Sequence, residues 1–215
     1  MRIICLSDTH GQHREVLVPP GDILIHAGDF TRRGQAGEIA DFNDWLGTLP
    51  HPHKVVVAGN HDWLFEQDPP RARALLTHAH YLEEEALVIE GLRLWGSPIT
   101  PWFFDWAFNR FRGDDIRRHW EMIPSDTDIL ITHGPPFGQL DLTRHGQAVG
   151  CEALAQELKR IRPRLHVFGH IHEGYGSVQA GATCFVNASV LDVQYVLVNA
   201  PWVVDTETWR AEAGA

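Results

Sequence analysis

Acidic and histidine side chains recur in this sequence directly after short apolar runs. Asp8 and His10 follow an apolar run at residues 3–6, and Asp29 follows a second run at residues 23–25. Carboxylate and imidazole groups bind divalent transition metals, and they also act as general acids and bases. Short apolar runs bounded by turn residues are typical of buried strands. The pattern therefore indicates chemistry at the ends of strands.

A pair of histidines stands at the end of another apolar run, residues 165–168. His170 and His172 are two residues apart, so on an extended strand they would point to one side, about 6 to 7 Å apart. An isolated pair of this kind is weak evidence, because most histidines are surface groups or are hydrogen-bonded. The hypothesis of a metal site therefore depends on partners elsewhere in the chain.

Such partners follow five of the predicted strands. Each has an ordinary explanation alone, because aspartates cap helices and Asn-His-Asp or His-Gly-Pro-Pro segments form turns. Together they favour a metal site whose predicted ligands are Asp8, His10, Asp29, Asn60, His133, His170 and His172. Nitrogen and oxygen donors without thiolate favour Mn, Fe, Zn, Co or Ni over a structural zinc site. Seven ligands are too many for one tetrahedral ion, and two divalent ions that share Asp29 fit the set.

Strands alternate with helices along most of the chain, which predicts an α/β fold. The predicted strands are residues 3–6, 23–25, 54–58 and 128–132, a hairpin at 86–89 and 92–95, and closing strands at 165–172, 183–189, 193–198 and 202–208. The predicted helices are residues 37–49, 69–79, 114–123 and 148–161. Alternating strands and helices imply parallel pairing, and ligands of such folds bind beyond the strand carboxyl ends. The polar clusters would therefore converge at one edge.

Length and charge narrow the class of protein. A chain of 215 residues builds one substantial core, so we expect a single domain, 1–215. The net charge of −10 argues against bulk nucleic-acid binding, which needs a basic face. Apolar runs fall short of the roughly 20 residues of a membrane span, and the strand-like start lacks the features of a secretory leader. The odd number of cysteines, Cys5, Cys151 and Cys184, suits a reducing compartment, so we expect a cytoplasmic protein without membrane contact.

The order of these motifs resembles that of the calcineurin-like metallophosphoesterases. Their signature of DxH, GD, GNH[DE], a lone H and GHxH stands here as Asp8-Thr9-His10, Gly28-Asp29, Gly59-Asn60-His61-Asp62, His133 and Gly169-His170-Ile171-His172. Segments such as GDILIHAGDFT and PRLHVFGHIHEGYG are similar to the branch that contains the animal metallophosphoesterase-domain-containing proteins expressed in brain, a likeness that spans residues 2–205. The resemblance implies a β-sandwich of two mixed sheets flanked by helices, with the active site at the strand carboxyl ends. It also implies an activity like that of the class III cyclic nucleotide phosphodiesterases.

The same resemblance assigns roles to the predicted site residues. It implies a first metal bound by Asp8, His10, Asp29 and His172, and a second bound by Asp29, Asn60, His133 and His170, with manganese as the working ion. A hydroxide between the metals would be the nucleophile, and His61 would protonate the leaving oxygen or stabilise charge on the phosphoryl group. Asn60 and Asp62 would assist, with Asp62 orienting the His61 imidazole. Some animal members of the branch have glycine where His170 stands, whereas this sequence keeps the histidine.

Aromatic residues crowd the segment 98–112 and leave two interpretations open. Trp102, Phe103 and Phe104 could form a wall that stacks a nucleobase beside the metals. The alternative is that the aromatic side chains pack onto the sheet or into a homodimer contact. Arg32 and Arg33, shortly after Asp29, could contact phosphate or could be solvated charges of a loop.

Three classes of function remain. The leading one is a phosphodiesterase acting on a small phosphodiester or nucleotide, with 2′,3′- or 3′,5′-cyclic nucleotides as substrates. Two divalent ions outweigh two aspartates and one hydroxide, so the site would attract a phosphodiester monoanion despite the acidic chain. The alternative is a phosphomonoesterase or protein phosphatase on the same metals, although the sequence shows no basic substrate groove. A non-enzymatic scaffold is disfavoured, because the ligand set and His61 are intact.

Overall fold

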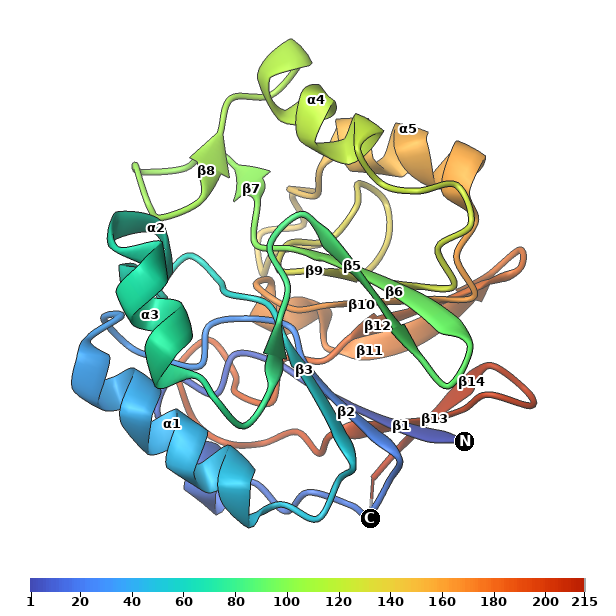
Figure 1. Cartoon of the computed structure of the whole chain (residues 1–215). Coiled ribbons are helices and arrows are strands. Elements are labelled where there is room, and N and C mark those ends of the chain that lie inside the picture. Colours follow the sequence, from blue (N-terminus) through green and yellow to red (C-terminus); the bar gives the residue numbers. More distant parts are fainter. Residues whose placement is uncertain (215) are drawn as a thin grey trace.

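The computed structural model describes residues 1–214, and most of their strands belong to two six-stranded sheets (Figure 1). The first sheet has the order β14-β13-β1-β2-β3-β4. Its strands are β1 (Arg2–Leu6), β2 (Ile23–His26), β3 (His53–Val56), β4 (His80–Tyr81), β13 (Trp202–Asp205) and β14 (Arg210–Ala213). The strands β1 to β4 pair in parallel, while β13 and β14 add antiparallel pairs at one edge. This sheet is therefore mixed.

The second sheet has the order β11-β12-β10-β9-β6-β5. Its strands are β5 (Glu85–Ile89), β6 (Leu92–Ser97), β9 (Ile129–Thr132), β10 (Leu165–Phe168), β11 (Gly176–Ala180) and β12 (Thr183–Asn187). The four central strands are parallel, and the edge strands β5 and β11 are antiparallel to their neighbours. Two short strands, β7 (Thr100–Pro101) and β8 (Asn109–Arg110), pair outside both sheets. The predicted sandwich of two mixed sheets is confirmed.

Alternation along the strands divides the core into layers. In β1, Ile3 and Cys5 contribute to the cluster between the two sheets, whereas Ile4 and Leu6 contribute to the cluster beneath the helices. Successive residues of a strand point to opposite faces, so a continuous apolar run is buried on both sides. Burial of each large apolar side chain stabilises the fold by roughly 1.5–3 kcal/mol.

Helices cover the outer faces of the sandwich (Figure 1). The elements α1 (Ala36–Thr48), α2 (Leu64–Gln67) and α3 (Pro69–Leu75) lie over the first sheet, and α4 (Asp114–Glu121) and α5 (Glu152–Ile161) lie over the second. In α1, the spacing of Ile39, Phe42 and Leu46 makes one apolar face, and all three are fully buried. The Gln35 and Glu38 side chains cap its first turn.

Three sequence predictions about elements are wrong. The strand expected at 165–172 ends at Phe168, and the short 3₁₀ helix η2 (His172–Gly174) follows it. Residues 193–198 form a turn instead of a strand, because the Asp192 carboxylate accepts the N–H groups of Gln194 and Val196. The expected helix 148–161 begins only at Glu152, since Cys151 caps it.

Other elements also differ from the predictions. The helix expected at 69–79 ends at Leu75, and a short 3₁₀ helix η1 (His13–Glu15), β11 and β14 were not anticipated.

Cys5, Cys151 and Cys184 are buried free thiols. Among residues 1–214, the structure contains no helix of the length and apolarity that crossing a bilayer requires. The single domain 1–215 stays a prediction, and Ala215 lies outside the described residues.

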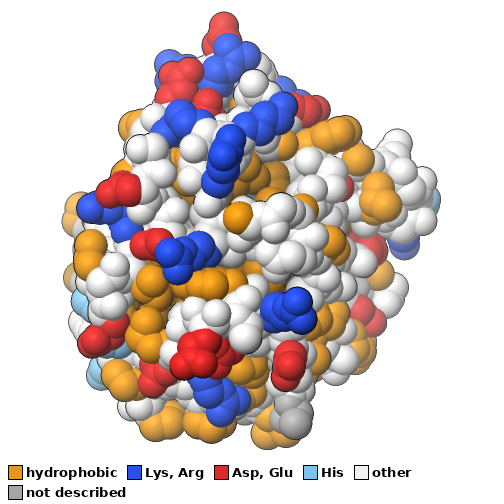
Figure 2. Space-filling model, turned by 90° about the vertical axis from the view of Figure 1, so that its right-hand side faces the viewer, with side chains coloured by type: hydrophobic (Ala, Val, Ile, Leu, Met, Phe, Trp, Pro, Cys, Tyr) orange, Lys and Arg blue, Asp and Glu red, His pale blue; other side chains and the backbone are white. Residues whose placement is uncertain are grey.

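Acidic and basic side chains are interspersed on the face shown in Figure 2, with charges of both signs towards the top. Exposed apolar side chains lie between them on the same face. The net charge of −10 is therefore not expressed there as one acidic field.

Candidate metal centre

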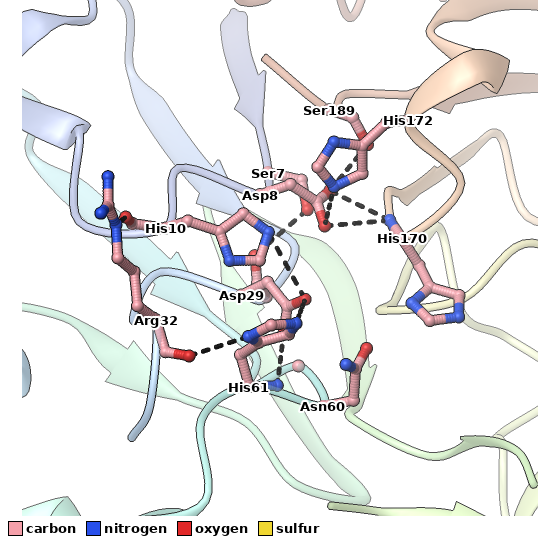
Figure 3. Close-up of polar contacts among 12 residues, drawn as sticks. Ser7, Asp8, His10, Asp29, Arg32, Asn60, His61, His170, His172 and Ser189 are labelled. Atoms are coloured by element: carbon pink, nitrogen blue, oxygen red, sulfur yellow. Dashed lines mark hydrogen bonds and ion pairs between the residues drawn. The ribbon is translucent and has the colours of Figure 1, made fainter. Parts of the chain in front are cut away.

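The carboxyl ends of five parallel strands converge and bring the predicted ligands together (Figure 3). Asp8 and His10 follow β1, Asp29 follows β2, Asn60 follows β3, His133 follows β9, and His170 and His172 follow β10. Their donor atoms form overlapping groups, each within 4.8 Å: Asp8 with His10 and His172, Asp29 with His133 and His170, and His10 with Asp29 and His61. His170 and His172 belong to different groups, as the predicted division of the pair requires.

Asp29 lies between the two predicted metal positions. Its Oδ1 accepts the backbone N–H of His61 at 2.8 Å. Its Oδ2 lies 3.7 Å from His10 Nε2 and 3.4 Å from His133 Nε2. One carboxylate oxygen therefore faces both groups, which is the arrangement that a shared ligand needs.

Two of the histidines are oriented by backbone carbonyls. His133 Nδ1 donates to the Ala27 carbonyl, and His172 Nδ1 donates to the Asp192 carbonyl, both at 2.9 Å. This contact fixes the tautomer, so that Nε2 faces the carboxylates in each case. An imidazole that donates through one nitrogen and presents the other is the usual arrangement of a metal ligand.

His10 gives an independent test of whether the residues fit a metal. Its side chain is buried, and neither ring nitrogen has a hydrogen-bond partner within residues 1–214. Burial lowers the pKa of His10 to about 4, so the ring is neutral and able to donate a lone pair. A buried unpaired nitrogen is costly unless something satisfies it. A metal ion bound by the neutral ring would satisfy it.

The charges of the carboxylates lead to the same conclusion. Burial acts to raise the pKa of Asp8, but the hydrogen bond and charge of His172 outweigh it and place that pKa well below its usual value. Burial acts to lower the pKa of His133, but the Asp29 carboxylate outweighs it and raises that pKa to about 9. Burial also acts to lower the pKa of His172, but the hydrogen bond and charge of Asp8 outweigh it and raise that pKa to about 9. Protons on these two rings neutralise the carboxylates, and divalent ions would replace them.

Several ligands adopt a backbone conformation that is unusual for residues other than glycine. Asp8, His10, Asp29 and His170 have φ values of 56°, 42°, 55° and 67°. Such left-handed residues cost about 1–3 kcal/mol each and persist where the surroundings impose them, often at functional sites. The left-handed conformation changes the direction of each side chain after its strand ends. Because His170 has this conformation, the segment at His170 is not extended.

Glycines in the motifs permit close approach. A Cβ atom at Gly169 would lie 2.0 Å from Asp8 Oδ2, and one at Gly59 would lie 2.2 Å from Asp29 Oδ1. Asp8 Oδ2 also accepts the Ser189 hydroxyl at 2.7 Å and the backbone N–H of His170 at 3.0 Å. The glycines therefore leave the space that the two carboxylates occupy.

His61 is oriented by a hydrogen bond through Nδ1, and its Nε2 faces the Asp29 carboxylate (Figure 3). Its Nδ1 donates to the carbonyl of Arg32 at 2.9 Å, and its ring stacks on Trp106 with centroids 4.4 Å apart. Its Nε2 lies 4.0 Å from Asp29 Oδ2. Asn60 Oδ1, on the same turn, lies 2.9 Å from His133 Nε2, among the atoms of the predicted second metal position.

The predicted contact of Asp62 with the His61 imidazole is wrong. The buried Asp62 carboxylate accepts the N–H groups of Asp29, Thr31 and Gly59 and the Thr31 hydroxyl, at 2.7 to 2.9 Å. Burial and the charge of Asp29 raise the pKa of Asp62 to about 7, while the hydrogen bonds oppose the rise. Asp62 therefore joins the loops after β2 and β3, and the Arg32 carbonyl orients His61.

A cavity of about 270 Å³ opens over the ligands, and its walls include Phe103, Trp106 and Tyr195. Of the three aromatic residues predicted to line the substrate pocket, only Phe103 lies in this cavity. Trp102 lines a neighbouring cavity of about 420 Å³ together with Phe103. Phe104 is 85% exposed and lines neither.

Sequence reasoning missed four contributors to the site. Trp106 lies inside the aromatic segment 98–112, so its place in that segment was the signal available in the sequence. Tyr195 was placed in a strand, and its ring lies over His10 with centroids 4.8 Å apart. Ser189 and the Arg32 carbonyl act through hydrogen bonds that a linear pattern does not display.

Comparison with known proteins agrees with this geometry. The profile of the family described as calcineurin-like phosphoesterase matches residues 1–174. The chain belongs to that family. Membership indicates a metal-dependent hydrolase acting on phosphoesters, in agreement with the three overlapping His/Asp groups.

Relatives of the family extend the likeness over almost the whole chain. Human metallophosphoesterase domain-containing protein 1 is 44% identical over 234 residues, which cover 97% of this chain and 72% of the human protein. One crystal structure aligns with a TM-score of 0.72 at 15% identity, over 99% of this chain and 98% of that one. A protein described as a novel archaeal phosphodiesterase aligns with a TM-score of 0.53 at 14% identity, over the same shares. At such identities the solved structures support the fold alone.

Proposed function

We propose that the protein is a phosphodiesterase that uses two divalent ions, with manganese as the working metal, and that its substrates are 2′,3′- or 3′,5′-cyclic nucleotides. The observation that carries the proposal is the position of Asp29 Oδ2, between the histidines of the two ligand groups and 4.0 Å from His61 Nε2. Paired metals of this kind supply Lewis acidity and an activated water for displacement at phosphorus.

The residues of the chain then have separate tasks. Asp8, His10, Asp29 and His172 would bind one ion, and Asp29, Asn60, His133 and His170 the other. His61, whose Nδ1 is committed to the Arg32 carbonyl, presents Nε2 to the cavity. In its protonated form this nitrogen donates a proton to the leaving oxygen. Trp106 stacks on the ring and keeps it in place.

The cavities around the metal pocket favour a diester over a monoester. The pocket shares Phe103 and His170 with the cavity of about 420 Å³ on one side. It shares His10, His61 and Tyr195 with another cavity, of about 460 Å³. A phosphorus atom in the pocket would thus have room for organic groups in two directions. The aromatic walls offer faces on which a nucleobase can stack.

A substrate panel tests the proposal. The manganese-loaded protein is assayed with 2′,3′-cyclic AMP, 3′,5′-cyclic AMP, bis-nitrophenyl phosphate and p-nitrophenyl phosphate, and an Asp29→Asn variant serves as the inactive control. We expect kcat/KM for at least one cyclic nucleotide to exceed that for the monoester. Faster turnover of p-nitrophenyl phosphate would instead support the phosphomonoesterase alternative. Absence of turnover with all four compounds would reject both.

A further inference from the structure

The cavity of about 460 Å³ lies on the His61 side of the metal pocket and has a different chemistry from the aromatic one. Its walls are His10, Arg32, His61, Gln194 and Tyr195. Three of these residues also line the metal pocket, so the two spaces adjoin. Arg32 adds a cation that the metal pocket lacks, and Gln194 adds a side-chain amide. We call this space the Arg32 cavity.

Arg32 is fixed in place at the wall of this cavity (Figure 3). Its Nε donates to the carbonyl of the predicted ligand His10 at 2.8 Å, and its own carbonyl accepts from His61 Nδ1. A side chain anchored in this way loses less rotamer freedom when it binds a ligand.

The guanidinium charge is not neutralised by a neighbouring carboxylate. Glu38 is close in sequence, but its carboxylate accepts the backbone N–H groups of Arg32, Arg33 and Gln35. None of the ion pairs within residues 1–214 includes Arg32. An anchored and unpaired guanidinium is a suitable group for binding a carboxylate or phosphate.

The wall of the Arg32 cavity formed by Gln194 and Tyr195 is also fixed. The Asp192 carboxylate accepts the N–H groups of Gln194 and Val196 at 2.8 and 2.9 Å. The Gln12 side-chain amide donates to the Tyr195 carbonyl at 3.0 Å. Because both walls are anchored, the cavity is formed before a ligand arrives.

The position of His61 decides which part of a substrate would enter the cavity. An acid that protonates the leaving oxygen must lie within hydrogen-bond reach of it. His61 lines the Arg32 cavity and does not line the aromatic cavity beside Trp102. With His61 as that acid, the leaving alcohol would depart towards Arg32, and the group that stays on phosphorus would lie towards Trp102 and Phe103.

We propose that the Arg32 cavity is a subsite for an anionic group on the leaving alcohol, and that Arg32 determines specificity for diesters whose leaving group carries a second negative charge, such as a carboxylate or phosphate. This inference rests on the proposed phosphodiesterase function. It predicts selectivity that cyclic nucleotides do not reveal, because their leaving oxygen stays attached to the product.

The test uses two matched phosphodiesters of phenol. In one, the leaving phenol carries a meta carboxylate, and in the other it carries the methyl ester of that carboxylate. We measure the ratio of kcat/KM for the charged over the neutral diester with the manganese-loaded protein. Arg32→Gln is expected to lower this ratio about tenfold. Any general loss caused by releasing the His10 carbonyl cancels in the ratio.

Arg33→Gln is the matched control, because it removes the same charge from the same loop at a residue that does not line the cavity. It is expected to change the ratio by less than twofold, and Arg32→Lys should retain part of the selectivity. Equal effects of the Arg32 and Arg33 substitutions, or an unchanged ratio in Arg32→Gln, would overturn the subsite.

Failure of the proposed function has a separate signature. If neither diester is cleaved, binding is measured instead. Calorimetric titration with analogues in which CH₂ replaces the leaving oxygen gives the dissociation constants of the charged and neutral compounds. The ratio of these constants then replaces the ratio of kcat/KM. Tighter binding of the charged analogue that depends on Arg32 would support the subsite in a protein that is not a phosphodiesterase. Equal binding of both analogues would reject the subsite as well.

Discussion

His61 is positioned by two neighbours that leave its Nε2 facing the Asp29 carboxylate. The Arg32 carbonyl engages Nδ1, and Trp106 covers one face of the ring. His61→Ala is expected to lower kcat by about 10² to 10⁴, with the larger loss for poor leaving groups, while the metal content stays constant. Steady-state kinetics and elemental analysis of the same preparations give both quantities.

His145→Ala is the control for this substitution, because it removes an exposed histidine whose Nε2 accepts a hydrogen bond from the neighbouring Arg144 side chain. His61 also lies within 4.8 Å of donor atoms of His10 and Asp29. A fall to one metal per chain in His61→Ala would therefore show that it is a ligand and not the acid.

His170 and His172 are neighbours in sequence but belong to different ligand groups. His170→Gly is expected to reduce the metal content from two ions to about one, because only the group with Asp29 and His133 loses a donor. Combining it with His133→Ala should cost little more, whereas combining it with His172→Gly should remove both ions. Retention of two tightly bound ions in His170→Gly would contradict the assignment.

The identities of the ligands were predictable from sequence, but their conformations were not. Seven residues stood after strand-like runs, and parallel strands place those positions at one edge. The backbone N–H groups of the left-handed residues Asp8, His10, Asp29 and His170 donate to acceptors that are distant in the sequence, which a local pattern does not display. The role of Asp62 was misjudged for the same reason, since its partners on Thr31 and Asp29 lie more than thirty residues away.

At the scale of elements, two strand ends carry a glycine that allows a carboxylate to approach the backbone, Gly59 after β3 and Gly169 after β10. A Cβ at Gly169 would lie 2.0 Å from Asp8 Oδ2 and 2.3 Å from Ser7 Oγ. Gly169→Ala is therefore expected to displace Asp8 and to weaken binding of the first ion by about 10- to 100-fold. Metal titration by calorimetry measures this loss.

Gly176→Ala, in β11, provides the matched control. The nearest atom to its Cβ would be Leu140 Cδ2 at 3.4 Å, and its φ is not positive. Unchanged affinity in Gly169→Ala, or equal losses in both variants, would show that the glycine does not set the position of Asp8.

Element boundaries were least predictable where apolar residues continue past a strand. Residues 193–198 resemble a strand because five of the six residues are apolar or aromatic, but the Asp192 side chain closes a turn there. Tyr195 adopts a φ of 61° in that turn. The carbonyl of Asp192 also orients His172, so the segment serves the site instead of a sheet.

At the scale of the whole molecule, burial on both faces of the sheets includes histidines that the metal centre does not use. His166 in β10 is fully buried, and its Nε2 lies 2.8 Å from the Thr132 hydroxyl, which donates to the Gly134 carbonyl. His166 therefore donates through Nε2. Burial lowers the pKa of His166 to about 3.

The pKa of His166 in the folded protein lies below the unfolded value of about 6.5, so protonation of this residue favours the unfolded chain. Between those values the unfolded chain binds the proton and the folded protein does not, so stability is lost as pH falls from about 6.5 towards 3. The loss from one group is about 1.4 kcal/mol per pH unit. Between pH 7 and pH 5, His166 alone should thus cost about 2 kcal/mol.

His166→Gln keeps a donor for Thr132 and removes the titration. Urea unfolding of the metal-free protein at pH 7 and pH 5 should show that the variant loses about 2 kcal/mol less than the parent chain over this interval. His133 and His172, whose pKa values are raised, titrate in both proteins and cancel in the comparison. His145→Gln, at an exposed position, should behave like the parent. An equal pH dependence in His166→Gln and the parent would mean that the sandwich admits a charged His166, and that the buried layer beneath α5 yields to water before the fold is lost.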